Sequence, residues 1–238
     1  MVKLIIASER YNSSAGWLNS YFLFSFADYY DFNNVHFGPL RVFNDDRIAG
    51  NSGFPMHAHS EMEIITIVLE GEVAHEDSLG NKTTISAGEV QRMTAGTGIT
   101  HSERNEQDKE LHLYQLWFMP NKQGLSPSYE QKSIDFYDAK NELIPLVSGQ
   151  KVLEDVVYMN SNSTIYYGKL NADKELNFQT FSIRKTFIYL IDGEVFVNGV
   201  QATKEDQLRI DQVDLVTIKA AQDSAFILID VPAVEANY

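Results

Sequence analysis

The chain of 238 residues contains no cysteine, which excludes disulfide bonds, thiolate metal ligands and a catalytic thiol. Basic residues are also few, because 19 Lys and Arg stand against 33 Asp and Glu, giving a formal charge of −14. Such a surface repels a phosphate backbone, so we expect no direct binding of nucleic acid. The lack of cysteine fits a cytoplasmic location, which we expect. No stretch approaches the ~20 apolar residues of a membrane span, so we expect no membrane partner.

Long stretches with helical periodicity are lacking as well, and strand patterns take their place. Strands are expected at Val2–Ser8, Leu40–Phe43, Ile64–Leu69, Thr83–Ile85, Leu111–Met119, Thr164–Leu170, Thr186–Ile191, Glu194–Val197, Leu215–Ile218 and Phe226–Ile229, with a turn at Glu70–Glu72. Asn198-Gly199 is typical of a type I′ hairpin turn. Asn121–Ser128 is expected to be a linker, and Asp138–Leu146 an irregular or helical segment. The sequence therefore predicts an all-β protein.

Two short motifs, one near each end of the segment 53–105, carry side chains of the kind that bind metals. His57 and His59 alternate on one expected strand, and His101 and Glu103 alternate on another. Alternate residues of a strand share a face, so the four ligands converge if the two strands pair. Imidazole nitrogens with one carboxylate suit iron, and manganese, cobalt, nickel, copper or zinc are also acceptable. We therefore predict a site for one divalent transition metal.

A second carboxylate competes for the fourth ligand position. Glu63 has the same odd-numbered parity as His57 and His59, so it would share their face on a continuous strand. Spacing alone does not decide between Glu63 and Glu103.

The other histidines are expected to lie outside the site. His36 falls in a surface loop, and His75 stands among acidic residues at what is expected to be a solvated hairpin. His112 faces away from Leu111 and Leu113 on its strand, where a role in supporting a ligand is the less favoured interpretation.

The segment 53–105 resembles the double cupin motif. The resemblance is carried by Gly53, His57, His59, Glu63 and Gly71 in the first half and by Gly88, Gly98, His101 and Asn105 in the second. Glu63 to Gly71 is one residue longer than the general cupin spacing, and Gly88 to Gly98 is two longer. Four further stretches, Phe24–Asp31, Phe37–Val42, Met62–Thr66 and Gln91–Gly98, resemble the pirin family, and the match is dense from Gly16 to Pro120.

The resemblance to pirins implies a pair of jelly-roll β-barrels of the cupin type, a bicupin. The N-terminal barrel, residues 1–128, would hold the metal, and the C-terminal barrel, residues 129–238, would lack it. The boundary is placed to within about ten residues, with an exchange of terminal strands left open. The pirin motif maps its ligands to His57, His59, His101 and Glu103, which favours Glu103 over Glu63.

An internal repeat supports two similar halves. Ile64–Val73 aligns with Thr186–Val195, and Gln115–Pro120 aligns loosely with Ile227–Pro232. Carried back along the first alignment, His57 falls on Gln179 and His59 on Phe181, and every histidine precedes residue 113. We therefore expect the second copy to have lost its metal site.

Two classes of function follow from the resemblance. As an enzyme, the protein would resemble quercetin 2,3-dioxygenases, with a small aromatic flavonol at an Fe(II) centre and Glu103 accepting the proton of the flavonol hydroxyl. As a regulator, it would bind a partner protein in a way that depends on the metal and its oxidation state. A third interpretation keeps the metal barrel but gives it another small substrate. The natural substrate, the native metal and the oligomeric state stay open.

Overall fold

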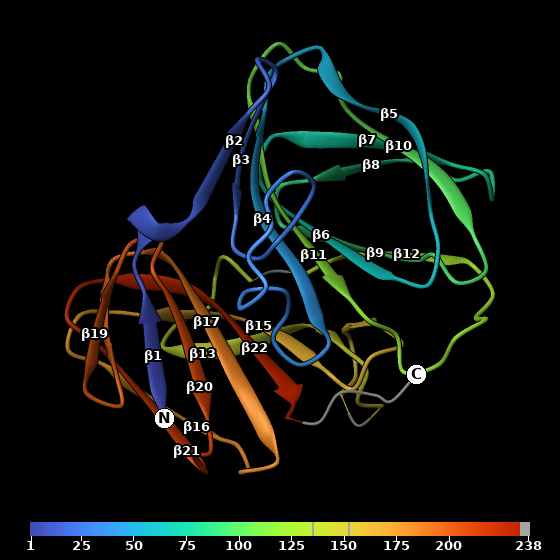
Figure 1. Ribbon diagram of the computed structural model, residues 1–238. Helices are drawn as coiled ribbons and strands as arrows, with labels where there is room; N and C mark the ends of the chain where they lie inside the picture. The colour runs from blue at the N-terminus through green and yellow to red at the C-terminus, as the bar shows by residue number, and fades with distance from the viewer. Residues whose placement is uncertain (135, 152, 234–238) are drawn as a thin grey trace. The chain divides into compact units, whose positions relative to one another are not determined.

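The computed structural model describes residues 1–134, 136–151 and 153–233, and they form an all-β protein (Figure 1). Among these residues the one helix is the 3₁₀ turn η1 (Ala7–Glu9). The chain divides into two compact units. The N-terminal unit comprises Tyr11–Ile134 and Val157–Ser161, and the C-terminal unit comprises Met1–Arg10 and the described residues of 135–156 and 162–237. The all-β prediction is confirmed.

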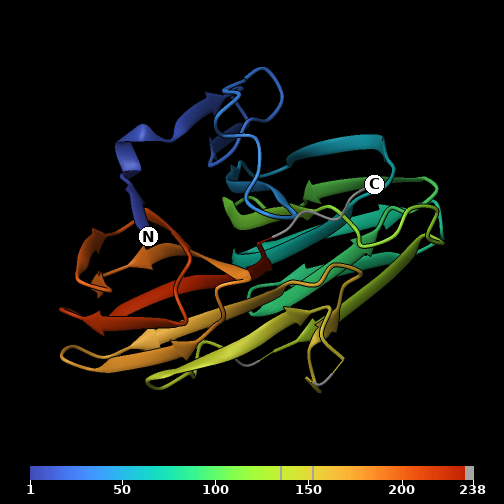
Figure 2. The same cartoon turned by 60° about the horizontal axis from the view of Figure 1, so that its bottom comes forward.

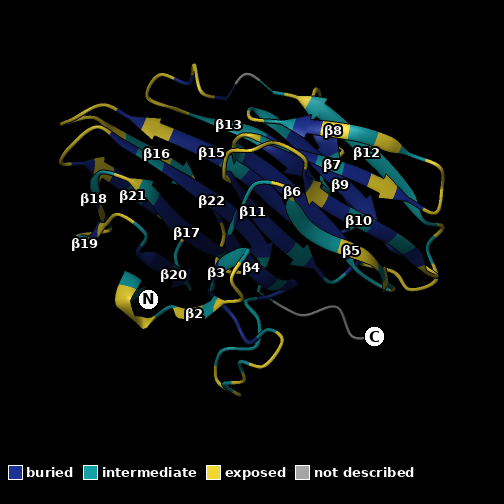
Figure 3. Ribbon diagram, turned by 90° about the horizontal axis from the view of Figure 1, so that it is seen from above, coloured by how far each residue is buried: buried dark blue, intermediate teal, exposed yellow. Residues whose placement is uncertain are grey.

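The larger sheet of the N-terminal unit has seven antiparallel strands. In spatial order they are β12 (Ser128–Ser133), β9 (Glu89–Thr94), β6 (Glu63–Glu70), β11 (Leu111–Phe118), β4 (Leu40–Ile48), β3 (Leu18–Phe22) and β2 (Tyr11–Ser14). The β-branched sequence of β6 makes it buried along almost its whole length, as Figure 3 shows for both β6 and β11. The two-residue strand β14 (Val157–Tyr158) also belongs to this unit.

The smaller sheet of the N-terminal unit carries the candidate site. Its order is β5 (Ser52–His59), β10 (Ile99–Asn105), β7 (Glu72–Asp77) and β8 (Lys82–Ser86). Figure 1 shows these strands across the barrel from β6 and β9, and Figure 2 shows the same strands from another side. The edge strands β5 and β8 keep exposed residues (Figure 3). Inward side chains of β5 and β10 therefore point into the space between the two sheets.

The C-terminal unit repeats this plan. Its larger sheet includes, in order, β1 (Val2–Ile5), β20 (Gln207–Asp211), β17 (Arg184–Asp192), β22 (Ser224–Pro232), β15 (Thr164–Leu170) and β13 (Glu142–Ser148). Its smaller sheet is β16 (Glu175–Gln179), β21 (Leu215–Ala220), β18 (Glu194–Val197) and β19 (Val200–Thr203). The order β9-β6-β11-β4 corresponds to β20-β17-β22-β15, so the predicted duplication is visible in the strand order.

Apolar side chains fill the C-terminal barrel where the N-terminal barrel carries the candidate ligands. Leu176 and Phe178 of β16 pack against a buried apolar cluster that includes Val216 and Ile218 of β21. β16 and β21 hold the places that β5 and β10 hold in the other unit. Apolar side chains thus stand in the C-terminal interior where histidines stand in the N-terminal one.

Three local predictions need correction. Glu142–Ser148 is a strand, whereas 138–146 was expected to be irregular or helical; Pro145 sits at a register shift, a place where a strand tolerates proline. The first strand ends at Ile5, earlier than expected, before the 3₁₀ turn. β4 continues through Asn44, Asp45 and Asp46 because neighbouring strands pair with it on both sides.

The hairpin prediction at Asn198-Gly199 is confirmed, because both residues have positive φ, 46° and 84°, as a type I′ turn requires. In the part of the chain that the structure describes, no helix is long and apolar enough to span a membrane.

Candidate metal centre

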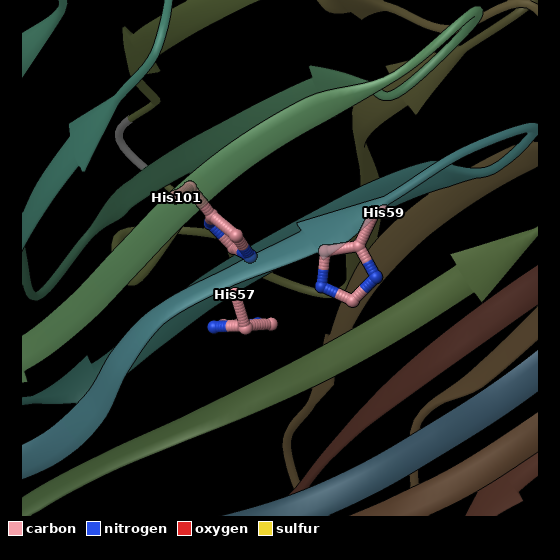
Figure 4. Close-up of side chains that lie close together, drawn as sticks. All are labelled: His57, His59 and His101. Atoms are coloured by element: carbon pink, nitrogen blue, oxygen red, sulfur yellow. The ribbon is translucent and has the colours of Figure 1, made fainter.

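Three of the predicted ligands form a tight cluster. β5 and β10 pair in antiparallel register with His101 directly opposite His57, and His59 lies two residues further along β5. Ring centroids are 4.4 Å apart for His57 and His101, 4.7 Å for His57 and His59, and 5.0 Å for His59 and His101. Each ring offers a nitrogen within 4.8 Å of the others. Figure 4 shows the three rings together, two from β5 and one from β10.

Burial keeps two of these imidazoles neutral. Burial, reinforced by the neighbouring His57 and His75, lowers the pKa of His101 to about 3. Burial, with His101 and His57 beside it, lowers the pKa of His59 to about 4. A neutral imidazole is the form that binds a metal, so both rings are ready for coordination at neutral pH.

The hydrogen bonding of the rings also fits a bound metal. His101 is 1% exposed, and neither of its ring nitrogens has a hydrogen-bond partner among the described residues. His57 places Nδ1 2.8 Å from the carbonyl oxygen of Pro55. A carbonyl only accepts, so Nδ1 carries the hydrogen and Nε2 keeps its lone pair. The cluster therefore offers ring-nitrogen lone pairs to which no described residue donates a hydrogen bond.

Glu103 lies in the same interior as these rings. Its carboxylate accepts hydrogen bonds from Gln115 Nε2 at 2.7 Å and from Thr66 Oγ1 at 3.2 Å, one on each oxygen. Among the described residues, Glu103 groups as a possible ligand with His75 and His101 rather than with His57 and His59. It nevertheless lines one cavity together with His57 and His59.

Glu63 lies elsewhere. Its carboxylate is fully buried and accepts hydrogen bonds from Thr94 Oγ1 at 3.1 Å and from the Asn160 backbone at 2.9 Å. Parity with His57 and His59 does not carry over, because β5 ends at His59 and the chain turns through Glu61, with φ of 52°, before β6 begins. Glu63 belongs to neither group of possible ligands among the described residues, nor to the lining of that cavity.

The prediction for His75 was wrong. It is 2% exposed, with Nε2 3.1 Å from Asp77 Oδ2 and its ring 5.4 Å from that of His101. The acidic residues around it in the sequence indicated a solvated hairpin, but β7 lies between β10 and β8, and its alternate residues point inward. His112 lies outside both groups and pairs with Asp45 at 2.7 Å. His36 is half-buried, with Nδ1 near the Gly38 carbonyl.

Several residues around the site were missed from the sequence. Thr66 and Gln115 hold Glu103, and each stands between two apolar or aromatic residues of a largely buried strand. A polar residue at an inward position of a buried strand is the signal that would have found them. Asp46, also missed, lies beyond the point where the strand was expected to end.

A cavity of about 280 Å³ adjoins the cluster. Its lining combines the candidate ligands with aromatic side chains and a few polar ones, including Phe22, Phe26, Phe54, Trp117, Ser20, Asn44, Asp46 and Gln115. Burial raises the pKa of Asp46 to about 7, the charges of Asp45 and Glu103 act in the same direction, and a hydrogen bond from Ser20 opposes them. The cavity suits a small, largely aromatic molecule with polar substituents.

The fold and the site together define a protein of two β-barrels, the first with a histidine centre suited to a single transition metal. Family models agree with this class: the model described as Pirin matches residues 6–118, and the model described as Quercetinase C-terminal cupin domain matches residues 146–231.

Three matches extend over 90% or more of this chain. A quercetin 2,3-dioxygenase of Escherichia coli K12 is 42% identical over 235 residues, which cover 98% of this chain and 100% of that protein. A pirin-like protein of Caulobacter vibrioides is 38% identical, with 90% and 93% covered. The crystal structure of the E. coli pirin YhhW in complex with nickel(II) has a TM-score of 0.93 at 41% identity, with 98% and 100% covered. The chain belongs to the pirin family and has its bicupin fold.

Proposed function

We propose that this protein is a metal-dependent dioxygenase that cleaves a flavonol such as quercetin with O₂. His57, His59, His101 and Glu103 would hold one divalent metal, Fe(II) in the native protein. The observation that carries the proposal is the three-histidine cluster, in which both ring nitrogens of His101 lack a partner among the described residues, at a cavity lined by aromatic rings. Similarity to a named quercetin 2,3-dioxygenase and to a pirin that binds nickel(II) supports it.

When bound, the metal would supply Lewis acidity and open coordination positions for substrate and O₂. The protein supplies the proton acceptor. Glu103 is 2% exposed and is held at both oxygens by Gln115 and Thr66, so its carboxylate is oriented before a substrate arrives. A carboxylate fixed in this way can accept the proton of the flavonol hydroxyl.

The aromatic residues would bind the rings of the substrate and exclude water. Trp117 packs edge-on against His59, with centroids 4.8 Å apart, and against Phe26 at 5.3 Å. Its indole donates to Gln115 at 3.2 Å, which ties the aromatic wall to the residue that orients Glu103. A planar flavonol would stack or make edge contacts with these rings.

Oxygen consumption tests the proposal. Iron-loaded protein should take up O₂ with quercetin above the rates of metal-free protein and of free iron, which control for autoxidation. A double variant, His57→Ala with His101→Ala, should fall to those background rates, whereas His36→Ala, which removes a histidine outside the cluster, should not. Absence of uptake above background across several flavonols, with partner binding that changes with the oxidation state of iron, would favour the regulatory alternative.

A further inference from the structure

One side of the cavity is polar, and the proposed chemistry does not use it. We call Ser20 of β3 with Asn44 and Asp46 of β4 the polar wall; all three line the cavity and are at most 5% exposed. Asn44 and Asp46 are two residues apart on one strand, so they share its inward face, about 7 Å apart along the strand. Asp45, between them, faces the other way and pairs with His112.

The polar wall presents acceptors that the protein does not satisfy. Ser20 Oγ donates a hydrogen bond to Asp46 Oδ1. Asp46 Oδ2 accepts no hydrogen bond from the described residues. Asn44 Oδ1 is buried and also lacks a partner among the described residues. Burying such oxygens without donors is costly, so a molecule that occupies the cavity gains by donating hydrogen bonds to them.

The aromatic part of the cavity lining decides what kind of hydrogen-bond donor fits. Phe22, Phe26, Phe54 and Trp117 line the same cavity. A hydrated or bare cation would need several oxygen ligands, and the polar wall offers one carboxylate, one amide and one hydroxyl already engaged with that carboxylate. A hydroxyl on an aromatic ring meets both requirements, because the ring packs on the aromatic residues and the O–H donates.

We infer that Asp46, held by Ser20, determines specificity by accepting a hydrogen bond from a phenolic hydroxyl other than the one that Glu103 serves. The substrate class is thereby narrowed to flavonols that carry additional ring hydroxyls. The inference rests on the proposed function for the identity of the ring system. It assigns Asp46 to recognition and Glu103 to proton transfer.

Anaerobic calorimetry on the metal-loaded protein at pH 8 tests the assignment without turnover. Two probes are compared: quercetin, with hydroxyls on all its ring systems, and 3-hydroxyflavone, which has the flavonol hydroxyl alone. Wild-type protein should bind quercetin at least about 10-fold more tightly, the scale of one hydrogen bond to a charged group.

Asp46→Asn should lose roughly 10–100-fold in affinity for quercetin and little for 3-hydroxyflavone. Ser20→Ala should show a smaller loss in the same direction. Asp45→Asn is the matched control: the same change one residue away, on the opposite face, should leave the ratio of the two affinities unchanged. Metal content and melting temperature, measured on every variant, separate recognition from misfolding.

The outcomes distinguish this inference from the proposed function. Loss of discrimination in Asp46→Asn supports the inference even if no flavonol is oxidised. Equal losses for both probes, or no loss, would overturn it while leaving the dioxygenase proposal intact if O₂ is consumed. Failure of the wild-type protein to bind either probe would overturn both.

Discussion

Hydrogen bonds within the folded chain fix the state of two ligand-type side chains in the centre, His57 and Glu103. The Pro55 carbonyl fixes the tautomer of His57. Gln115 and Thr66 fix both oxygens of Glu103 from the opposite sheet. The donor atoms are therefore oriented by the protein before any metal binds, which reduces the cost of binding it.

Glu103→Gln tests the carboxylate role. The amide keeps the shape but is a weaker donor and a poor base, so we expect metal affinity to fall by about 10-fold or more. Turnover at saturating metal should fall by about 10²–10⁴-fold, the contribution typical of a general base, with a smaller change in flavonol affinity. Metal titration and steady-state kinetics separate the two effects.

Glu63→Gln is the matched control for that experiment. Its amide oxygen can still accept from Asn160 and Thr94, and Glu63 neither lines the cavity nor belongs to the three-histidine cluster. It should bind metal as the wild-type protein does. Retention of metal by Glu103→Gln together with its loss in Glu63→Gln would reverse the assignment of the carboxylate.

Asp46 should make the stability of the metal-free protein depend on pH. Its pKa is raised to about 7 by burial, so the folded state keeps a proton that the unfolded chain loses near pH 4. The free energy of unfolding contributed by this group therefore falls as pH rises from about 4 through 7. Asp46→Asn removes the effect. The free energy of unfolding of the variant, relative to that of wild type, should therefore rise by about 3 kcal/mol as the pH is raised from 5 to 8.

Urea unfolding of both proteins at several pH values measures this difference, and the contributions of His59 and His101 cancel in the comparison. Metal-loaded protein should show a weaker effect, because a nearby positive charge favours the ionised carboxylate. Parallel stability curves for the two metal-free proteins would show that Asp46 is ionised across the whole range.

At the scale of elements, the pairing of β5 with β10 positions the centre. The register shifts between His101 and Glu103, so that His101 faces His57 while Glu103 faces Phe54. Gly53 permits this close approach, since a Cβ there would lie 2.3 Å from the Glu103 carbonyl oxygen and 2.6 Å from the Arg104 Cα. Both contacts are to backbone, which cannot move aside without shifting β10.

Gly53→Ala should therefore disturb the site as well as the fold. We expect a loss of roughly 1–3 kcal/mol in the free energy of unfolding from overpacking, together with weaker metal binding as Glu103 is displaced. Gly98→Ala is the control: its φ of 138° resembles the 152° of Gly53, but a Cβ there meets nothing within 4 Å. Chemical unfolding and metal titration should separate the variants, and equal metal affinities would contradict the close-approach argument.

Strand parity explains how far the sequence could predict these elements. Within one strand it works, and it places His57 with His59 and His101 with Glu103. Parity fails across a turn. The sequence therefore made Glu63 an alternative to Glu103 as the fourth ligand, although β6 is a separate strand from β5. Asp46 was missed because three consecutive polar residues predict a turn, whereas pairing with β3 and β11 extends β4 through them.

At the scale of the whole molecule, the sequence predicts the duplication and shows that no histidine follows residue 112. The matching strand orders of the two units confirm the repeat. The burial of His75 could not be predicted from the sequence, because it depends on which strands flank β7. The two barrels therefore share one strand plan and differ in their interior side chains. Strand β5 carries His57 and His59, whereas the corresponding strand β16 carries Leu176 and Phe178, which pack in an apolar core.

One metal per chain is the expected consequence. Metal analysis after loading and removal of excess should give close to one equivalent, because the C-terminal interior offers no histidine ligand. Since a metal that binds only the folded state stabilises it by RT ln(1 + [M]/Kd), loading at 100 times Kd should add about 2.7 kcal/mol to the free energy of unfolding. His59→Ala should lower both the metal content and this stabilisation, whereas His36→Ala should retain both. Two equivalents in the wild-type protein, or a metal-induced rise in melting temperature that survives His59→Ala, would place the dominant metal site outside the three-histidine cluster.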